Sequence, residues 1–303
     1  MLKTTMAMVF ALTSCASALS QEAPRNAGGG TERNASGSLR QIIPGYYAYT
    51  SGSFNSGVIA TSDGVVVLDA LNSAAVGRAE RQAIANTTEA PVRVLVSSTF
   101  HNNYSKGNVA YADVWKIGHE NYRTDLLALM QREKVSAEEQ KARLPNQTYQ
   151  DRVTLYFGGK EIQVLYMGRA HTRGDSIIYV PQDRIAYLSE LFFADQFPYI
   201  DDGYGLDWLK ALDAVQALGA QIYVPAHGPI TSDPRESQES LHRARQILVD
   251  IRDAVQQAIA HGATEEQALA TVQWPQYEKL RGYSAQREVA VRRLYRQLSG
   301  SLN

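Results

Sequence analysis

The segment Val92–Tyr104, VRVLVSSTFHNNY, contains the features that decide the fold. Its first six residues form a short, mostly apolar run, which predicts a buried strand. This strand leads directly into a loop that carries His101. Loops at one edge of a sheet are where groups from distant parts of a chain converge. The segment therefore predicts both a sheet and a site at the edge of that sheet.

Strands and helices alternate on both sides of this segment. Val65–Asp69, VVVLD, predicts a buried strand that ends in a carboxylate, and helices are expected over 74–90 and 207–218. Further strands are expected over 153–156, 162–166, 177–180, 185–188 and 222–224. Because this alternation occurs in two halves with hairpins at the sheet edges, we predict an α/β fold. The specific architecture is a four-layer αβ/βα sandwich, two mixed sheets with helices outside.

Composition excludes several classes of protein. The 303 residues include 30 Lys+Arg and 31 Asp+Glu, a net charge of −1 that argues against nucleic-acid binding. Hydrophobic residues make up 44% of the chain and predict a globular protein, yet no apolar run approaches the roughly 20 residues of a transmembrane helix. The single cysteine, Cys15, excludes an intramolecular disulfide framework and a cysteine-based zinc site.

The two ends of the chain differ in character. Residues 1–20 predict an export signal, and residues 21–40, which include three consecutive glycines, predict a flexible tether. An alternative interpretation treats residues 12–15, LTSC, as a lipobox with a lipid anchor on Cys15; both place the protein in the periplasm or on the outer membrane of a bacterium. Residues 41–233 form the core domain, and 234–303 form helices that pack on it, one of them opened by a capping box at Thr264.

Three histidines and one glutamate follow predicted strands. His101, His171 and His227 each stand where a strand gives way to a loop, and Glu190 follows the strand over 185–188. Imidazoles and a carboxylate held on such a frame suit a divalent metal, most often zinc. We therefore predict that these four residues are metal ligands.

At these residues the chain resembles the metallo-β-lactamase superfamily of hydrolases. The resemblance covers 45–231 and rests on VVVLD, the loop over 99–108, GRAHTRGD at 168–175, LSEL at 188–191 and PAHGP at 225–229. It implies the αβ/βα sandwich and one or two metals, usually zinc, that activate water. The implied substrates are small molecules such as esters, lactones, thioesters or β-lactams, and the sequence does not distinguish among them.

The main metal loop departs from the pattern His-x-His-x-Asp-His of this superfamily. His101 is kept, whereas Thr99, Asn103 and Tyr104 replace a histidine, the aspartate and the last histidine. Asn103 binds a cation weakly and cannot act as a base. The resemblance then implies one zinc ion rather than two, with Glu190 as bridging-type ligand or base and Tyr104 as hydrogen-bond donor to an oxyanion. The alternative is an inactive relative that binds a ligand or a partner.

Other residues are expected around this centre. Phe197, Tyr199 and Tyr204 follow Glu190 in an irregular loop and are predicted to line a substrate pocket. Asp69 either holds a ligand histidine through its other ring nitrogen or caps a turn. Thr99 and Asp175 are placed beside the ligands, Asp175 mainly as a tie within its own loop. The oligomeric state is not predicted.

Overall fold

A computed structural model describes residues 37–302 and confirms the predicted α/β class. The predicted export signal, Cys15 and the tether up to residue 36 lie outside the described residues. The end of the predicted tether is wrong, because residues 38–40 belong to strand β1, Ser38–Ile43. Its backbone pairs antiparallel with β2, Tyr46–Ser51, and this pairing orders a segment that has few apolar side chains.

The strands form one continuous hydrogen-bonded path with two halves. Ten of them pair in the order β7-β6-β5-β4-β3-β12-β11-β10-β9-β8, and β2 and β1 continue from β3. Strand pairing joins the two halves at β3 and β12, where His227 lies opposite Phe54. The remaining strands are β3 (Phe54–Thr61), β4 (Gly64–Leu68), β5 (Val92–Ser97), β6 (Trp115–His119), β7 (Gln147–Tyr149), β8 (Arg152–Phe157), β9 (Lys160–Leu165), β10 (Ile177–Val180), β11 (Ile185–Phe193) and β12 (Ile222–His227).

Helices cover both outer faces of this sheet system. They are α1 (Ala74–Ala85), α2 (Asn102–Ser105), α3 (Glu120–Arg132), α4 (Ala137–Arg143), α5 (Gly205–Ala217), α6 (Pro234–Ala260), α7 (Glu265–Thr271) and α8 (Tyr283–Leu298). The predicted capping box at Thr264 is confirmed. The Thr264 hydroxyl accepts from the Gln267 amide, and the Gln267 side-chain oxygen accepts from the Thr264 amide. Within residues 37–302, no helix combines the length and the apolar character that a membrane span requires.

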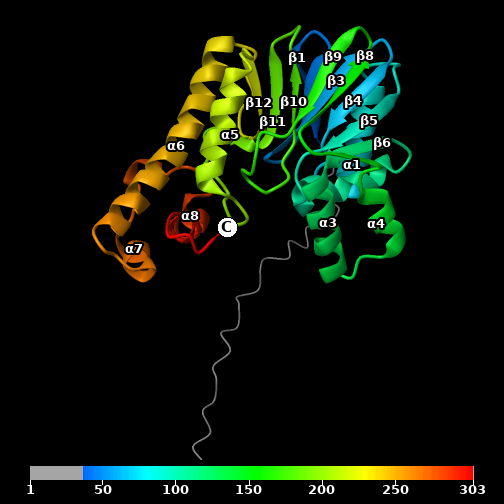
Figure 1. The fold of residues 1–303 in the computed structure, drawn as a ribbon. Coiled ribbons are helices and arrows are strands. Elements are labelled where there is room, and N and C mark those ends of the chain that lie inside the picture. The colour runs from blue at the N-terminus through cyan, green and yellow to red at the C-terminus, as the bar shows by residue number, and fades with distance from the viewer. Residues whose placement is uncertain (1–36, 303) are drawn as a thin grey trace, which may run out of the picture. The chain divides into compact units, whose positions relative to one another are not determined.

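Alternating side chains divide the core into layers. Along β4, Val66 faces the core between the two halves together with Ile178 of β10, whereas Val65 and Val67 face the α1 side. On β10, Ile177 faces the opposite way, toward α5 and α6. Each central strand is therefore buried on both faces, which explains its nearly continuous apolar sequence. The result is the predicted order of helices, sheet, sheet and helices (Figure 1).

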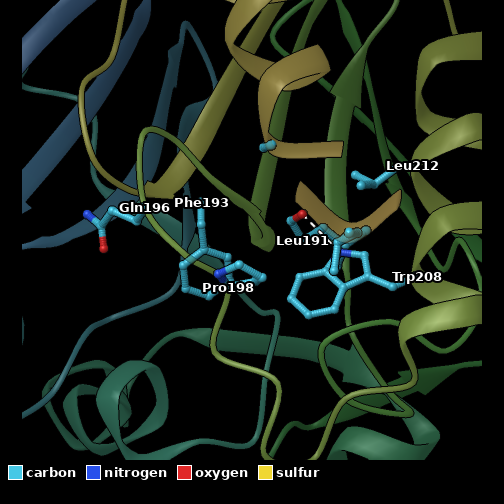
Figure 2. A pocket seen from close by; sticks show the side chains of 8 residues that line it. Leu191, Phe193, Gln196, Pro198, Trp208 and Leu212 are labelled. Atoms are coloured by element: carbon cyan, nitrogen blue, oxygen red, sulfur yellow. Dashed lines mark hydrogen bonds between the residues drawn. The ribbon is translucent and has the colours of Figure 1, made fainter. Parts of the chain in front are cut away.

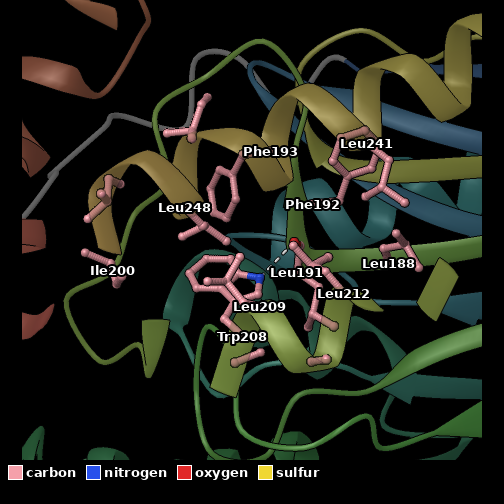
Figure 3. Packing of buried hydrophobic residues seen from close by; sticks show 14 of the residues in the cluster. Leu188, Leu191, Phe192, Phe193, Ile200, Trp208, Leu209, Leu212, Leu241 and Leu248 are labelled. Carbon is pink, nitrogen blue, oxygen red and sulfur yellow. Dashed lines mark hydrogen bonds between the residues drawn. The ribbon is translucent and has the colours of Figure 1, made fainter. Parts of the chain in front are cut away.

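The C-terminal helices share the core of the second half. Trp208 of α5 packs under β11, and its indole N–H donates to the Leu191 carbonyl at 3.0 Å. Leu241 and Leu248 of α6 lie in the same cluster (Figure 3), as does Leu294 of α8. Helices α5, α6 and α8 are thus held against β11, the strand that carries Glu190.

Candidate metal centre

The four predicted ligands meet at one edge of the sheets. His101 immediately precedes α2, after β5, and His227 is the last residue of β12. Glu190 lies within β11, at a register irregularity, and His171 lies in the loop between β9 and β10. Because β4 and β5 run parallel, as do β11 and β12, their carboxyl ends bring these distant residues together.

The distances among the ligand atoms are short. His171 Nε2 lies 2.9 Å from His101 Nδ1 and 3.1 Å from Glu190 Oε2. His101 Nδ1 lies 3.3 Å from the same carboxylate oxygen. Tetrahedral ligands at 2.0–2.1 Å from a zinc ion are about 3.4 Å apart. These three residues can therefore hold a cation of that size with small adjustments. The fourth, His227, has its Nε2 3.5 Å from Glu190 Oε1.

Each histidine uses its other ring nitrogen for a hydrogen bond away from the centre. The outward bonds are His101 Nε2 to Asp202 Oδ2 at 2.9 Å, His171 Nδ1 to the Tyr199 carbonyl at 2.8 Å and His227 Nδ1 to the Ser53 carbonyl at 3.1 Å. A carbonyl oxygen only accepts, so the outward nitrogens of His171 and His227 must carry the proton. The inward nitrogens of these two rings face the Glu190 carboxylate, where each can carry a proton or offer a lone pair to a cation.

A buried carboxylate among three imidazoles requires positive charge beside it, either protons on the rings or a cation. His171, Glu190 and His227 are each at most 5% exposed, so water does not shield their lone pairs from one another. Burial lowers the pKa of His101, but its bonds to Asp202 and Glu190 raise that pKa to about 10. Burial likewise raises the pKa of Glu190, but His171 and hydrogen bonds from the histidines hold it well below its usual range. The site favours an anionic Glu190 beside a proton or a metal cation.

The second-metal side of the motif is closed by Tyr104. Its buried hydroxyl donates to the Ala226 carbonyl at 2.9 Å and lies 3.2 Å from His227 Nε2. Burial raises the pKa of Tyr104 well above its usual value, so the phenol stays protonated. The expected role of Tyr104 as an oxyanion donor is corrected, because its proton is directed at a backbone carbonyl. Asn103 is exposed on α2.

Asp69 holds serines rather than a histidine. Its carboxylate accepts from the Ser98 amide at 2.8 Å, from the Ser98 hydroxyl at 2.6 Å and from the Ser189 hydroxyl at 2.8 Å. Burial raises the pKa of Asp69 to about 7, although these hydrogen bonds offset part of the effect. Ser189 has φ +47°, a conformation that favours glycine. Asp69 therefore links Ser98, just after β5, to Ser189 of β11, a role that differs from both expected ones.

Thr99 and Asp175 lie close to the ligands without joining them. Thr99 is buried, and among the described residues its hydroxyl oxygen has no hydrogen-bond partner. Asp175 accepts from the Thr172 amide at 2.6 Å and from the Thr172 hydroxyl, and these bonds lie within the loop that carries His171. Thr99 thus leaves an unpaired polar atom at a position where the superfamily pattern has a ligand.

The three aromatic residues predicted to line a pocket have different roles. Phe197 is fully buried against Trp274 and Tyr283. It therefore belongs to the core and does not line a substrate pocket as predicted. Its neighbours Gln196 and Pro198 instead line a small, mainly apolar cavity of about 10 Å³ (Figure 2), room for one water at most. Side chains alternate along this extended segment, which turns Phe197 toward the helices.

Tyr199 and Tyr204 stay near the centre. The Tyr199 ring lies 6.2 Å from the His227 ring, and its carbonyl orients His171. Tyr204 lies under the guanidinium of Arg169, at 4.4 Å from the ring centre. Asp202, which no sequence motif marks, contacts His101 directly. In the sequence, Asp202 is marked only as the second residue of the acidic pair Asp201-Asp202. It lies 101 residues from His101, so no sequence motif contains both partners of the contact.

Comparisons with known proteins agree with this fold. The sequence profile described as the metallo-beta-lactamase superfamily matches residues 50–227, more than half of the chain. A linear primary-alkylsulfatase from Pseudomonas sp. (strain ATCC 19151) is 23% identical over 146 residues, 46% of this chain and 27% of that protein. The chain therefore matches well under two thirds of that relative.

Two solved structures share the fold. A metallo-beta-lactamase from Pontibacter korlensis superposes with a TM-score of 0.60 at 20% identity, over 70% of this chain and 99% of the other. A stereoselective inverting sec-alkylsulfatase from Pseudomonas sp. superposes with a TM-score of 0.68 at 16% identity, over 86% of this chain and 50% of the other. At these identities the likeness establishes the fold alone.

Proposed function

The chain belongs to the metallo-beta-lactamase superfamily of hydrolases, and we propose that it is a metal-dependent hydrolase with one cation held by His101, His171 and Glu190. The observation that carries this proposal is the direction of the imidazoles. The outward ring nitrogens bond to Asp202 and to the carbonyls of Tyr199 and Ser53, so the inward nitrogens converge on an anionic carboxylate. Two histidines and a carboxylate are ligands that zinc prefers.

One cation fits this chain better than two. A second metal would need His227 together with side chains at positions 103 and 104. Asn103 is exposed, and the Tyr104 phenol already lies 3.2 Å from His227 Nε2. His227 is then an auxiliary group, 3.5 Å from Glu190.

The roles of the residues follow from their charges. A bound divalent cation lowers the pKa of a coordinated water from 15.7 toward about 7. Glu190 acts as a ligand rather than as a base, because a carboxylate with a strongly lowered pKa is a weak proton acceptor. Asp202 and the Tyr199 carbonyl hold the imidazoles in the tautomers that leave their inward nitrogens free.

Metal analysis tests the proposal directly. Protein dialysed against zinc and then against buffer should retain one equivalent of metal per chain, and His171→Ala should retain none. His242→Ala is the matched control, because His242 is exposed on α6. Wild-type protein without stoichiometric metal would overturn the proposal. Anomalous scattering at metal absorption edges would identify the element and count the ions.

The substrate is proposed by class. Esters, lactones, thioesters and β-lactams are candidates, and the likeness to an alkylsulfatase structure over 86% of the chain supports adding alkyl sulfate esters. Hydrolysis of one class that is lost in His171→Ala identifies the substrate. If zinc binds but no class is hydrolysed, the alternative of a ligand-binding relative is favoured.

Export is also proposed, from the sequence of residues 1–20. Fractionation of expressing bacteria should place the protein outside the cytoplasm. Release from the membrane by Cys15→Ala would indicate a lipid anchor, and retention in the cytoplasm would contradict both interpretations.

A further inference from the structure

The C-terminal helix α8 contacts the loop that orients two of the metal ligands. Residues 199–204 carry both outward partners, the Tyr199 carbonyl for His171 and the Asp202 carboxylate for His101. Residues 199–204 lie outside every helix and strand, so regular backbone pairing does not fix their position. Contacts from another element must therefore hold the loop.

Gln286 of α8 supplies two of these contacts. Its side-chain oxygen accepts from the Ile200 amide at 3.0 Å, and its side-chain nitrogen donates to Asp201 Oδ2 at 2.8 Å. Gln286 is only 5% exposed, so the bonds are shielded from water. Gln286 is thus hydrogen-bonded to both residues between Tyr199 and Asp202.

Arg293, two turns further along α8, holds the other end of the loop. Its guanidinium donates twice to the Gly203 carbonyl, at 2.7 and 3.1 Å. The Tyr204 amide in turn donates to the Ala170 carbonyl at 2.8 Å, next to His171. The loop is thus fixed on both sides of Asp202, by side chains that touch no metal ligand themselves.

We propose that α8 is a positioning element for the metal centre and that Gln286 is the positioning residue through which it sets the orientation of His101 and His171. The inference rests on the proposed function. If the loop relaxes, the Tyr199 carbonyl and the Asp202 carboxylate move together, and both imidazoles lose the partners that fix their tautomers. Loss of such outer partners typically weakens metal binding by about 10–100-fold.

Gln286→Met tests the proposal, with Gln297→Met as matched control. Gln297 also lies on α8 and also accepts from a backbone amide, that of Leu206 at 3.0 Å, but it holds the start of α5 rather than the loop. Zinc affinity, measured by competition with a fluorescent chelator, should fall by about tenfold in Gln286→Met and stay unchanged in Gln297→Met. Hydrogen exchange of the Ile200 amide in metal-free protein should accelerate only in Gln286→Met.

The outcomes separate the two proposals. Wild-type protein that binds no zinc overturns the proposed function and this inference together. Wild-type protein that binds zinc, with equal affinity in Gln286→Met, overturns the inference alone, as does an equal loss in both variants. Should Gln286→Met not fold, Gln286→Glu keeps the acceptor for Ile200 and removes the donor to Asp201. Unchanged zinc affinity in that variant also overturns the inference.

Discussion

Two buried glutamates of this chain have opposite charge states. Glu190 lies among three histidines, and its pKa is held well below the usual range. Glu80 of α1 is fully buried and accepts hydrogen bonds from the hydroxyls of Ser56 and Tyr111, the latter at 2.8 Å. Burial raises the pKa of Glu80 to about 8, and the two hydroxyls offset only part of this effect.

The difference shows that the partners, not burial, decide what a buried carboxyl group does. Hydroxyl groups are neutral donors, so Glu80 is protonated at neutral pH and serves as a structural hydrogen-bonding group between α1 and β3. Imidazoles can be cationic, so Glu190 keeps its negative charge despite equal burial. A buried anion that is paired in this way is suited to bind a cation.

The largest effect is expected for Glu190→Gln. The amide removes the negative charge that draws a cation among the histidines, so metal affinity should fall by more than about 100-fold, beyond the loss of an outer partner. Hydrolysis should fall with it. Zinc content and rate measured together check this, and full metal occupancy in the variant would show that the histidines suffice.

Glu80→Gln should instead leave zinc binding unchanged and alter the pH dependence of stability. The folded protein keeps the Glu80 proton up to about pH 8, whereas the unfolded chain releases it near 4.5. Folding takes up a proton in this interval, so the wild-type free energy of unfolding falls as pH rises, by up to about 1.4 kcal/mol per pH unit.

In Glu80→Gln this contribution disappears, so the variant gains stability relative to wild type as the pH rises from about 4.5 to about 8, and the difference stays constant above that. Asp69, whose pKa is raised to about 7, contributes in the same direction and remains in both proteins. Urea unfolding at pH 5, 7 and 9 checks the difference. Parallel pH profiles for the two proteins would contradict the charge state assigned to Glu80.

A smaller effect is expected from the two buried tyrosines beside these carboxyl groups. Tyr111→Phe removes a donor to Glu80 and should cost about 1–3 kcal/mol of unfolding free energy.

Tyr104→Phe leaves the Ala226 carbonyl without the phenol donor and should cost about 1 kcal/mol of unfolding free energy, with zinc content still one per chain. Urea unfolding and metal analysis check both. A second zinc in Tyr104→Phe would show that the phenol alone blocks that position.

The motifs predicted which residues meet in the candidate centre because each motif is local. His101 and His171 follow strands and His227 ends one, so the ends of strands bring them to a common edge. Asp202 and Gln286 carry no such pattern. Their contacts, with His101 and with Ile200, join residues far apart in the chain, and no short sequence window contains both partners.

The amino-acid sequence alone determined the α/β class and layer order, because apolar periodicity is a property of neighbouring residues. Three features depend on tertiary contacts: the direction of the Phe197 side chain, the ring nitrogen that each histidine turns toward the centre, and the negative charge on Glu190 rather than Glu80. Those outcomes depend on hydrogen-bond partners and local electric fields, and these are set by residues that folding, not sequence order, brings into contact.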